Sequence, residues 1–290
     1  MKRTSVFLLL FTQLRPKQWV KNLLIFAALL FSTQLLNVDA IILSVMGFIL
    51  FSLTASSIYI LNDFKDIEAD RHHPTKRFRP MASGLLNPKF ALSTGIILLI
   101  VSLITAFIVN KLFFVIIIVY FVANTLYSLY LKHVVLIDIM LIALGFVLRA
   151  VGGAVIINVP FTPWFLLCTM LLSLFLAIGK RRHELTIQLE GNSHRKVLDE
   201  YSLPFLDQLT SIVTSATIVS YAVFTFTSGN TIHLMWTIPI VVYGIFRYLY
   251  LIHIQNKGGA PEKVLFEDRH ILITVILYVL SVFVILTLFD

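Results

Sequence analysis

Long apolar runs recur along the whole chain and restrict the folds open to it. Nine stretches of about 20 residues carry few or no charges, and each is long enough to cross a ~30 Å hydrocarbon core as a helix. They lie near 18–35, 39–61, 90–110, 112–131, 134–157, 162–180, 208–228, 233–252 and 271–289. Only 13% of the residues are charged, against about 25% in a soluble domain. We therefore predict an all-α, polytopic membrane protein with nine transmembrane helices.

The basic residues predict how this chain is oriented. The formal net charge is +8, which taken alone would suggest a nucleic-acid partner. However, most of the 23 Lys and Arg residues lie before the first run or in alternate connections, and Lys111 stands on the other side. This distribution follows the positive-inside rule, with a cytoplasmic amino terminus and Asp290 outside the cell (inner) membrane. We expect no nucleic-acid partner.

The polar connections predict one domain, 1–290, with a polar region at one membrane surface. Residues 1–17 resemble an interfacial, amphipathic lead-in rather than a cleaved signal peptide, because no small-residue cleavage site follows the apolar stretch. The longest polar connections, about 62–89, 180–207 and 253–270, all fall on the predicted cytoplasmic side. Any cap over a cavity would be built there. The sequence leaves homo-oligomerisation open.

An acidic segment follows the second run. Asn62, Asp63, Asp66 and Asp70 are spaced so that all four project from one side of a helix, within an arc of roughly 100°. Glu68 falls on the opposite side. Mg²⁺ prefers oxygen ligands and commonly binds through one or two carboxylates together with substrate phosphates. We predict a Mg²⁺ site formed by Asn62, Asp66 and Asp70; the alternative is a solvated helix end.

A basic loop comes directly after the acidic segment. Lys76, Arg77 and Arg79 offer donors for phosphate oxygens, and arginine can bind two oxygens at once. An acidic face followed by a basic loop suits a ligand that carries both a metal ion and phosphates. Metal-assisted departure of a diphosphate is the chemistry that this combination favours.

Five further charged residues lie at or inside the predicted membrane segments. Asp138 stands about one turn inside its run, where an acid is costly unless partnered, so we interpret it as functional or as a partner of Lys132. Arg149 lies near mid-bilayer and would hold either backbone carbonyls or an anion. Lys21 is either part of an interfacial anchor or a contact for an anionic ligand. Lys180 is either a topogenic charge, four residues from Glu184 on the same helix face, or such a contact.

The acidic spacing resembles the Asn-Asp-x-x-Asp-x-x-x-Asp motif of the UbiA-type membrane prenyltransferases, matched without gaps by residues 62–70. That resemblance implies nine transmembrane helices around a central cavity with a cytoplasmic cap. The aromatic prenyltransferases of this superfamily carry a second motif, Asp-x-x-x-Asp. Here Asp138 is followed four places later by Ile142, so the second pair is missing.

Five blocks of the sequence look like the decaprenyl-phosphate phosphoribosyltransferase subgroup. They are Arg-Pro-Lys-Gln-Trp-Val-Lys-Asn at 15–22, the run 70–84, Tyr-Ser at 127–128 through Leu-Arg-Ala at 148–150, Gly-Lys-Arg at 179–181, and Ala-Pro-Glu at 260–262 before Asp-Arg at 268–269. The subgroup implies a phosphoribosyl diphosphate donor, a polyprenyl phosphate acceptor and Mg²⁺.

This resemblance assigns roles to the candidate residues. The catalytic set would be Asp66, Asp70 and Asp138. The phosphate contacts would be Lys76, Arg77 and Arg79 for the ribose 5-phosphate, and Lys21, Lys132, Lys180 and Arg149 for the lipid phosphate. Two alternatives stay open: transfer of a prenyl group from its diphosphate to an aromatic acceptor, and transport of an anionic solute, which intramembrane Arg149 would favour.

Overall fold

All secondary structure in the described part of the chain is helical. The computed structural model describes residues 5–32, 34–72, 75–189, 196–227 and 231–289, so the predicted lead-in and the 180–207 connection are only partly covered. The α-helices are α1 (Val6–Gln13), α2 (Phe26–Leu30), α3 (Val38–Lys65), α4 (Ile67–His72), α5 (Pro88–Val109), α6 (Lys111–Leu129), α7 (Ile137–Ile156), α8 (Pro163–Leu189), α9 (Leu203–Thr227), α10 (Ile238–His253), α11 (Pro261–Glu267) and α12 (Arg269–Phe289). Short 3₁₀ helices are η1 (Pro16–Ile25), η2 (Lys76–Phe78), η3 (Leu131–His133), η4 (Lys196–Glu200) and η5 (Ile232–Thr237).

The prediction of an all-helical, multi-pass membrane protein is confirmed. Eight helical segments within the described ranges are long and apolar enough to cross a membrane. The run 18–35, predicted as the first span, instead forms η1 and the five-residue helix α2. Pro16 stands at the start of η1, after Arg15 in the left-handed backbone region. A count of nine membrane crossings therefore stays a prediction.

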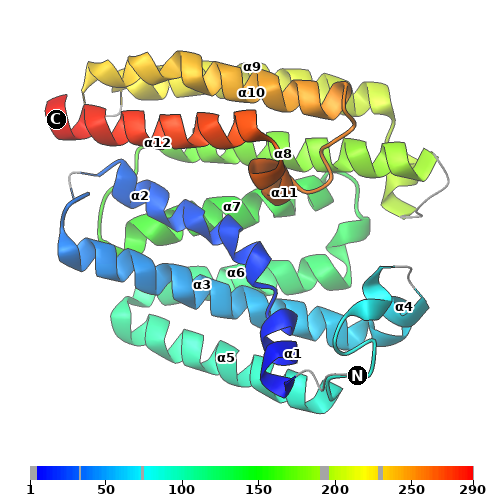
Figure 1. Ribbon diagram of the computed structural model, residues 1–290. Coiled ribbons are helices and arrows are strands. Elements are labelled where there is room, and N and C mark those ends of the chain that lie inside the picture. Colours follow the sequence, from blue (N-terminus) through cyan, green and yellow to red (C-terminus); the bar gives the residue numbers. More distant parts are fainter. Residues whose placement is uncertain (1–4, 33, 73–74, 190–195, 228–230, 290) are drawn as a thin grey trace.

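The long helices lie side by side in two groups (Figure 1). In one group α8 and α9 pack together beside α10 and α12, and in the other α3 packs against α5 and α6. Between them lie α7 and the η1–α2 segment. Helix α7 contributes to a hydrophobic core in each group: Ile156 packs in the core that contains Phe51 of α3, and Ile139 packs in the core that contains Phe175 of α8. The segments that meet at this junction therefore come from distant parts of the sequence.

A glycine on α7 allows η1 to approach closely. A Cβ atom added to Gly153 would lie 2.1 Å from the carbonyl oxygen of Ile25, a backbone atom that cannot move aside as a side chain can. A Cβ atom on the neighbouring Gly152 would lie 2.8 Å from the ring of Phe51. Small residues permit this kind of contact between membrane helices. Gly153 thus allows η1, which carries Lys21, to lie against α7, and Gly152 makes room for Phe51 of α3.

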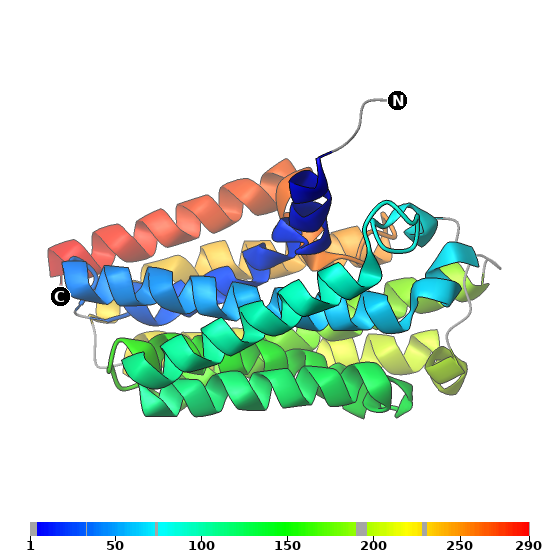
Figure 2. The same ribbon diagram turned by 90° about the horizontal axis from the view of Figure 1, so that it is seen from below.

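Helix α1 lies on one side of the bundle, beside α3, at a steep angle to the long helices (Figures 1 and 2). Its Phe7 side chain is 80% exposed, and Val6 and Leu8 are also exposed. Leu10 packs against the small core that contains Ile60 and Met81. One side of α1 is therefore held by the protein, and the other presents apolar side chains, as expected for a helix at a membrane surface.

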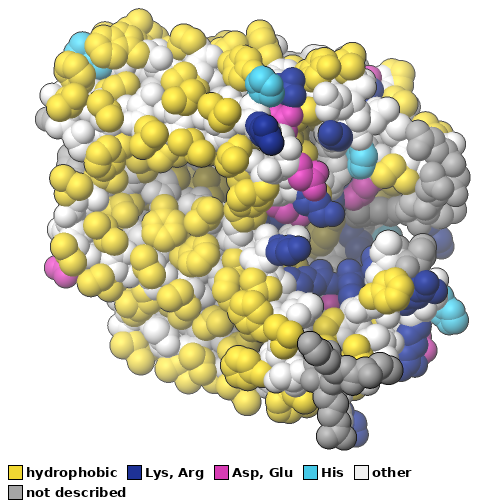
Figure 3. Space-filling view, in the orientation of Figure 1, with side chains coloured by type: hydrophobic (Ala, Val, Ile, Leu, Met, Phe, Trp, Pro, Cys, Tyr) yellow, Lys and Arg dark blue, Asp and Glu magenta, His cyan; other side chains and the backbone are white. Residues whose placement is uncertain are grey.

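The surface divides into an apolar region and a charged region. Hydrophobic side chains cover most of the face in Figure 3, as expected for helices that meet lipid. Lys, Arg, Asp and Glu side chains gather at one end of that face, around a hollow. The segments that contain α4 and α11 reach this end, whereas the chain ends at the opposite, apolar end (Figure 1).

Candidate functional site

The acidic segment is interrupted at Asp66. Helix α3 ends at Lys65, Asp66 is its C-cap with φ −95° and ψ 11°, and α4 begins at Ile67. Backbone hydrogen bonds from Asp66 to Asn62 (3.0 Å) and from Asp70 to Asp66 (2.8 Å) nevertheless keep the four-residue spacing. The expectation of one uninterrupted helical face is therefore corrected: the spacing survives, but the segment bends at Asp66.

The members of this segment differ in exposure and in partners. Asp63 and Asp70 are each 3% exposed, whereas Asn62 and Asp66 are partly exposed. Asp63 accepts hydrogen bonds from Gln13 (2.6 Å), Arg15 (2.5 Å) and Arg79 (2.9 Å). Asp63, one of the two buried carboxylates of the motif, thus accepts hydrogen bonds from side chains of two other segments.

Arg79 bridges two carboxylates of the motif. Its Nη1 lies 2.9 Å from Asp63 Oδ1 and 2.6 Å from Asp70 Oδ2. Of the other two basic residues, Arg77 is exposed and lies over the ring of Phe78 at 4.8 Å, and Lys76 is exposed on η2. The structure therefore brings Arg79 onto the acidic segment and leaves Lys76 and Arg77 at its outer side.

The donor set decides what metal site this segment can offer. No group of three or more His, Cys, Asp and Glu residues in the described part of the chain could enclose a metal. The side chains of Asn62 and Asp66 form no hydrogen bond or ion pair with any described residue. Mg²⁺ usually keeps water and takes one or two carboxylates plus substrate phosphates. The segment fits a Mg²⁺ shared with a diphosphate, and does not fit a cage built by protein alone.

Asp138 is enclosed by a separate network. It is fully buried and forms an ion pair with Arg181 of α8, with Oδ2 and Nε 2.6 Å apart. The hydroxyl of Tyr201 donates to its other oxygen at 2.8 Å. Arg181 also pairs with Glu184 and donates to the hydroxyl of Tyr127. The ion-pair partner of Asp138 is therefore Arg181, where the sequence had suggested Lys132.

The phenol of Tyr201 stays a hydrogen-bond donor in this network. Burial raises the pKa of Tyr201 well above its ordinary value, and the hydrogen bond to the charged Asp138 adds to that effect, against the lowering effect of the Leu136 N–H group. A neutral phenol can donate to Asp138 while it accepts from Leu136, at 2.7 Å. The other oxygen of Asp138 accepts no hydrogen bond from a described residue, but it faces Nε of Arg181 at 2.6 Å in the ion pair.

Arg149 is buried in the middle of α7 without a carboxylate partner. It donates to the side-chain oxygen of Asn22 (2.6 Å), the carbonyl of Gly145 (2.6 Å) and the hydroxyl of Tyr120 (2.7 Å). Among the described residues no carboxylate lies within ion-pair distance of it. Its hydrogen bonds are largely met, but its charge is not balanced by these neutral groups.

Lys21 and Lys180 stand beside Glu262 of α11. Lys21 Nζ lies 3.5 Å from the Glu262 carboxylate and 2.7 Å from the side-chain oxygen of Gln18. Burial alone would raise the pKa of Glu262, but the charge of Lys21 and nearby hydrogen bonds outweigh it and hold that pKa below its ordinary value. Lys180 adds a smaller effect of the same sign, and it pairs with Glu184 at 3.9 Å.

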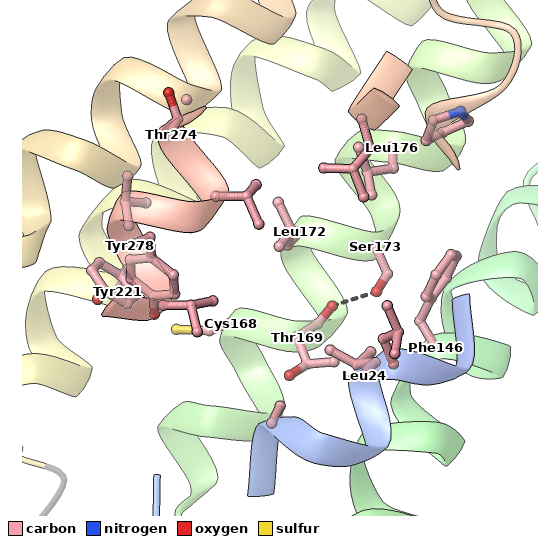
Figure 4. A pocket seen from close by; sticks show the side chains of 18 of the residues that line it. Leu24, Phe146, Cys168, Thr169, Leu172, Ser173, Leu176, Tyr221, Thr274 and Tyr278 are labelled. Atoms are coloured by element: carbon pink, nitrogen blue, oxygen red, sulfur yellow. Dashed lines mark hydrogen bonds between the residues drawn. The ribbon is translucent and has the colours of Figure 1, made fainter. Parts of the chain in front are cut away.

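A largely apolar cavity of about 740 Å³ begins at Lys21 and Glu262. Figure 4 shows side chains from four long helices around it: Phe146 of α7, Leu172 and Leu176 of α8, Tyr221 of α9, and Thr274 and Tyr278 of α12. Leu24 of η1 closes another side. A long apolar chain with an anionic end is the kind of ligand that these walls suit.

Sequence reasoning missed the partners that hold the site together. Gln13 and Arg15 on Asp63, Arg181 and Tyr201 on Asp138, and Glu262 beside Lys21 were not assigned roles. Arg15, Arg181 and Glu262 lie inside the sequence blocks that carry the family resemblance, and this was the available sign that they matter. Gln13 and Tyr201 lie outside these blocks, so the sequence gave no sign of their role.

Sequence comparisons place relatives over most of this chain. The UbiA prenyltransferase family matches residues 22–268. The decaprenyl-phosphate phosphoribosyltransferase of Mycolicibacterium smegmatis is 33% identical over 88% of this chain and 85% of its own length. The protein of the same name from Corynebacterium glutamicum is 36% identical over 88% of this chain and 80% of its own length.

Solved structures resemble the fold. A UbiA homolog from Archaeoglobus fulgidus, bound to DMAPP and Mg²⁺, has a TM-score of 0.71 at 19% identity, covering 98% of this chain and 100% of that one. A digeranylgeranylglyceryl phosphate synthase structure has a TM-score of 0.69 at 18% identity, covering 98% and 99%. At such low identity the likeness concerns the helical architecture.

Proposed function

Because the chain belongs to the UbiA prenyltransferase family, we propose that it transfers the 5-phosphoribosyl group of phosphoribosyl diphosphate to a polyprenyl phosphate. The reaction breaks the bond between the anomeric carbon and diphosphate and forms a bond from that carbon to the lipid phosphate. The chain is then a pentosyltransferase, like its named relatives in Mycolicibacterium and Corynebacterium.

The burial of Asp138 in an ion pair is the observation that favours phosphoribosyl diphosphate as the donor. Both of its oxygens are taken by Arg181 and Tyr201, so this position offers no second carboxylate site for a metal. The aromatic prenyltransferases that the sequence resembles pair two acidic motifs. This chain retains one acidic motif and replaces the other by a buried ion pair, which favours the phosphoribosyl donor over a prenyl diphosphate.

The donor would bind at the acidic segment and the basic loop. Asn62, Asp66 and Asp70 would hold Mg²⁺, which neutralises negative charge on the departing diphosphate when it is bound. Lys76 and Arg77 would contact the ribose 5-phosphate. Both contacts of Arg79 to carboxylates use Nη1, so its remaining N–H groups can serve that phosphate as well.

The acceptor would bind between the two helix groups, with its tail in the apolar cavity. Lys21 and Lys180 stand near Glu262, where the cavity begins, and the unbalanced charge of Arg149 acts on Lys21 from α7. A phosphate there would offset the positive charge of these residues, with Lys132 as a further candidate contact. A phosphate monoester is already anionic, so attack on the anomeric carbon needs no general base.

Catalysis would rest on position and charge rather than on proton transfer. The chain would hold the two substrates in line and exclude water from the anomeric carbon. Asp138 would act as a positioning residue, because it holds Arg181 and with it the turn of α8 that carries Lys180. We place the charged end of the bundle and the amino terminus in the cytoplasm, with the carboxyl terminus on the outer side of the cell membrane.

The test is a transfer assay with purified protein in detergent. Labelled phosphoribosyl diphosphate, a polyprenyl phosphate and Mg²⁺ should give a labelled lipid, and chelation of Mg²⁺ should stop its formation. A prenyl diphosphate with an aromatic acceptor serves as the matched comparison. Turnover of that pair without labelling of the lipid phosphate would contradict the proposal. Diphosphate release in detergent also argues against transport, since no compartments exist there.

A further inference from the structure

We propose that Gln13 and Arg15 are positioning residues of the donor site, and that they act through Asp63 rather than by contact with substrate. The proposal rests on the function proposed above. It assigns Asp63, one of the two buried carboxylates of the acidic segment, to the support of Arg79 and Asp70 instead of to a metal. The amino-terminal segment thereby becomes part of the donor site.

Asp63 accepts hydrogen bonds from three side chains that belong to two other segments. Its Oδ1 receives Arg15 at 2.5 Å and Arg79 at 2.9 Å, while Oδ2 receives Gln13 at 2.6 Å. With both oxygens engaged and 3% of the residue exposed, Asp63 has little capacity left for a metal or for phosphate. Charge-assisted hydrogen bonds of this length are among the stronger ones in proteins.

Arg79 connects Asp63 to Asp70, so a change at Asp63 also affects the position of Asp70. The same Nη1 that contacts Asp63 also contacts Asp70, at 2.6 Å. Two guanidinium groups therefore face two carboxylates, and the charges of Arg15, Arg79, Asp63 and Asp70 balance. Loss of Arg15 leaves one guanidinium for two carboxylates, which draws Arg79 towards Asp63 and loosens Asp70.

Arg15 is held in an unfavourable backbone conformation. Its φ of 55° and ψ of 59° lie in the left-handed region, which non-glycine residues seldom occupy. Such conformations persist when the surroundings hold them, and they concentrate at functional sites. Here Ser56 donates to the Leu14 carbonyl at 2.9 Å and accepts from Trp19 at 3.0 Å, so the chain is pinned on both sides of Arg15.

Helix α1 fixes the approach of Gln13. Leu9, Leu10 and Leu14 pack against the core that contains Ile60 and Met81, and these lie on α3 and just after the basic loop. The side chain of Gln13 is buried between them and Asp63. The contact therefore joins α1 to both halves of the donor site.

The experiment compares Arg15→Ala and Gln13→Ala with the control Lys17→Ala. Lys17 is exposed and lies two residues from Arg15, so its loss removes the same charge without touching Asp63. We expect the KM for phosphoribosyl diphosphate to rise about 10- to 100-fold in Arg15→Ala and about 3- to 10-fold in Gln13→Ala. The KM for polyprenyl phosphate should change less than about twofold, and Lys17→Ala should leave both KM values unchanged.

A double-mutant cycle separates positioning from general damage. In an Asp63→Asn background the further change Arg15→Ala should cost much less than it does alone, because the shared partner is already altered. Arg15→Lys, which keeps the charge, should recover part of the donor KM. Arg15→Lys and Gln13→Leu also serve if Arg15→Ala does not fold. Equal changes in both KM values, or full additivity in the cycle, would overturn the proposal.

A binding readout keeps this inference separate from the proposed function. Phosphoribosyl diphosphate with Mg²⁺ should raise the unfolding temperature of the wild-type protein and of Lys17→Ala, and should do so much less for Arg15→Ala. Wild-type protein that shows this shift without labelling lipid would contradict the proposed reaction only. A shift of equal size in wild type and Arg15→Ala would contradict the role of Arg15 only.

Discussion

The acidic segment 62–70 and the site around Asp138 both place buried carboxylates next to arginine, but they leave different groups available. In the acidic segment Arg79 and Arg15 neutralise Asp63 and Asp70, while the side chains of Asn62 and Asp66 have no hydrogen-bond or ion-pair partner among the described residues. Around Asp138 every carboxylate oxygen has a protein partner, and neither Asp138 nor Arg181 is exposed to any extent.

Because of this difference, the acidic segment can bind a metal ion or a substrate, whereas the network around Asp138 can only stabilise the packing of helices. An oxygen ligand serves a metal only when it has a lone pair to spare, and Asp66 meets that condition where Asp138 does not. The buried pair instead joins α7 to α8, and through Glu184 and Lys180 it reaches the region where the acceptor would bind. Asp66 would contact the metal ion directly, whereas Asp138 would affect the reaction only by holding α7 and α8 together.

The largest effect is expected from Arg181→Ala. Removal of one partner from a fully buried pair leaves Asp138 charged and unpaired, which costs about 3–5 kcal/mol. The unfolding temperature of the detergent-solubilised protein should fall well below that of wild type. Replacement of both Asp138 and Arg181 by leucine should recover stability relative to Arg181→Ala, since it removes the buried carboxylate as well, and Glu184 is partly exposed and keeps Lys180 as a partner. An Arg181→Ala protein as stable as wild type would mean that the pair does not hold α7 to α8.

Asp66→Asn should reduce transfer about 100- to 1,000-fold while the unfolding temperature stays near that of wild type, because it removes charge stabilisation from a partly exposed side chain. The measurement is the rate of lipid labelling at saturating substrates. Glu68→Gln is the control: Glu68 is exposed and pairs with Arg71, an interaction worth about 0–1 kcal/mol. Near-native transfer by Asp66→Asn would remove Asp66 from the metal site.

A smaller effect is expected from Asp268, which pairs with Arg247 at 2.7 Å near the start of α12. Hydrogen bonding from Arg247 holds the pKa of Asp268 below its ordinary value of 3.8. The stability that the pair contributes is therefore complete above about pH 5, where Asp268 is ionised in the unfolded chain as well, and is lost as the pH falls through the lowered pKa. The difference in unfolding temperature between wild type and Asp268→Asn should stay constant from pH 7 to about pH 5 and shrink below it. A difference that grows in acid would be inconsistent with this pair.

Much of the architecture could be predicted because hydropathy acts locally. A run of about 20 apolar residues must form a helix in lipid, since its backbone groups find no other partners there. The exception is 18–35, where η1 and α2 replace a regular span. The close contact between Gly153 and Ile25 accompanies this irregular segment, and such a contact between distant residues leaves no periodic signal.

The membrane class, the family resemblance and the four-residue spacing of Asn62, Asp66 and Asp70 follow from the amino-acid sequence, because each depends on the order of residues along the chain. Which carboxylates remain available to a ligand depends on the folded structure. The partners of Asp63 and Asp138 include Arg15, 48 residues away, and Tyr201, 63 residues away. Whether a carboxylate binds a ligand or an arginine depends on what folding brings next to it.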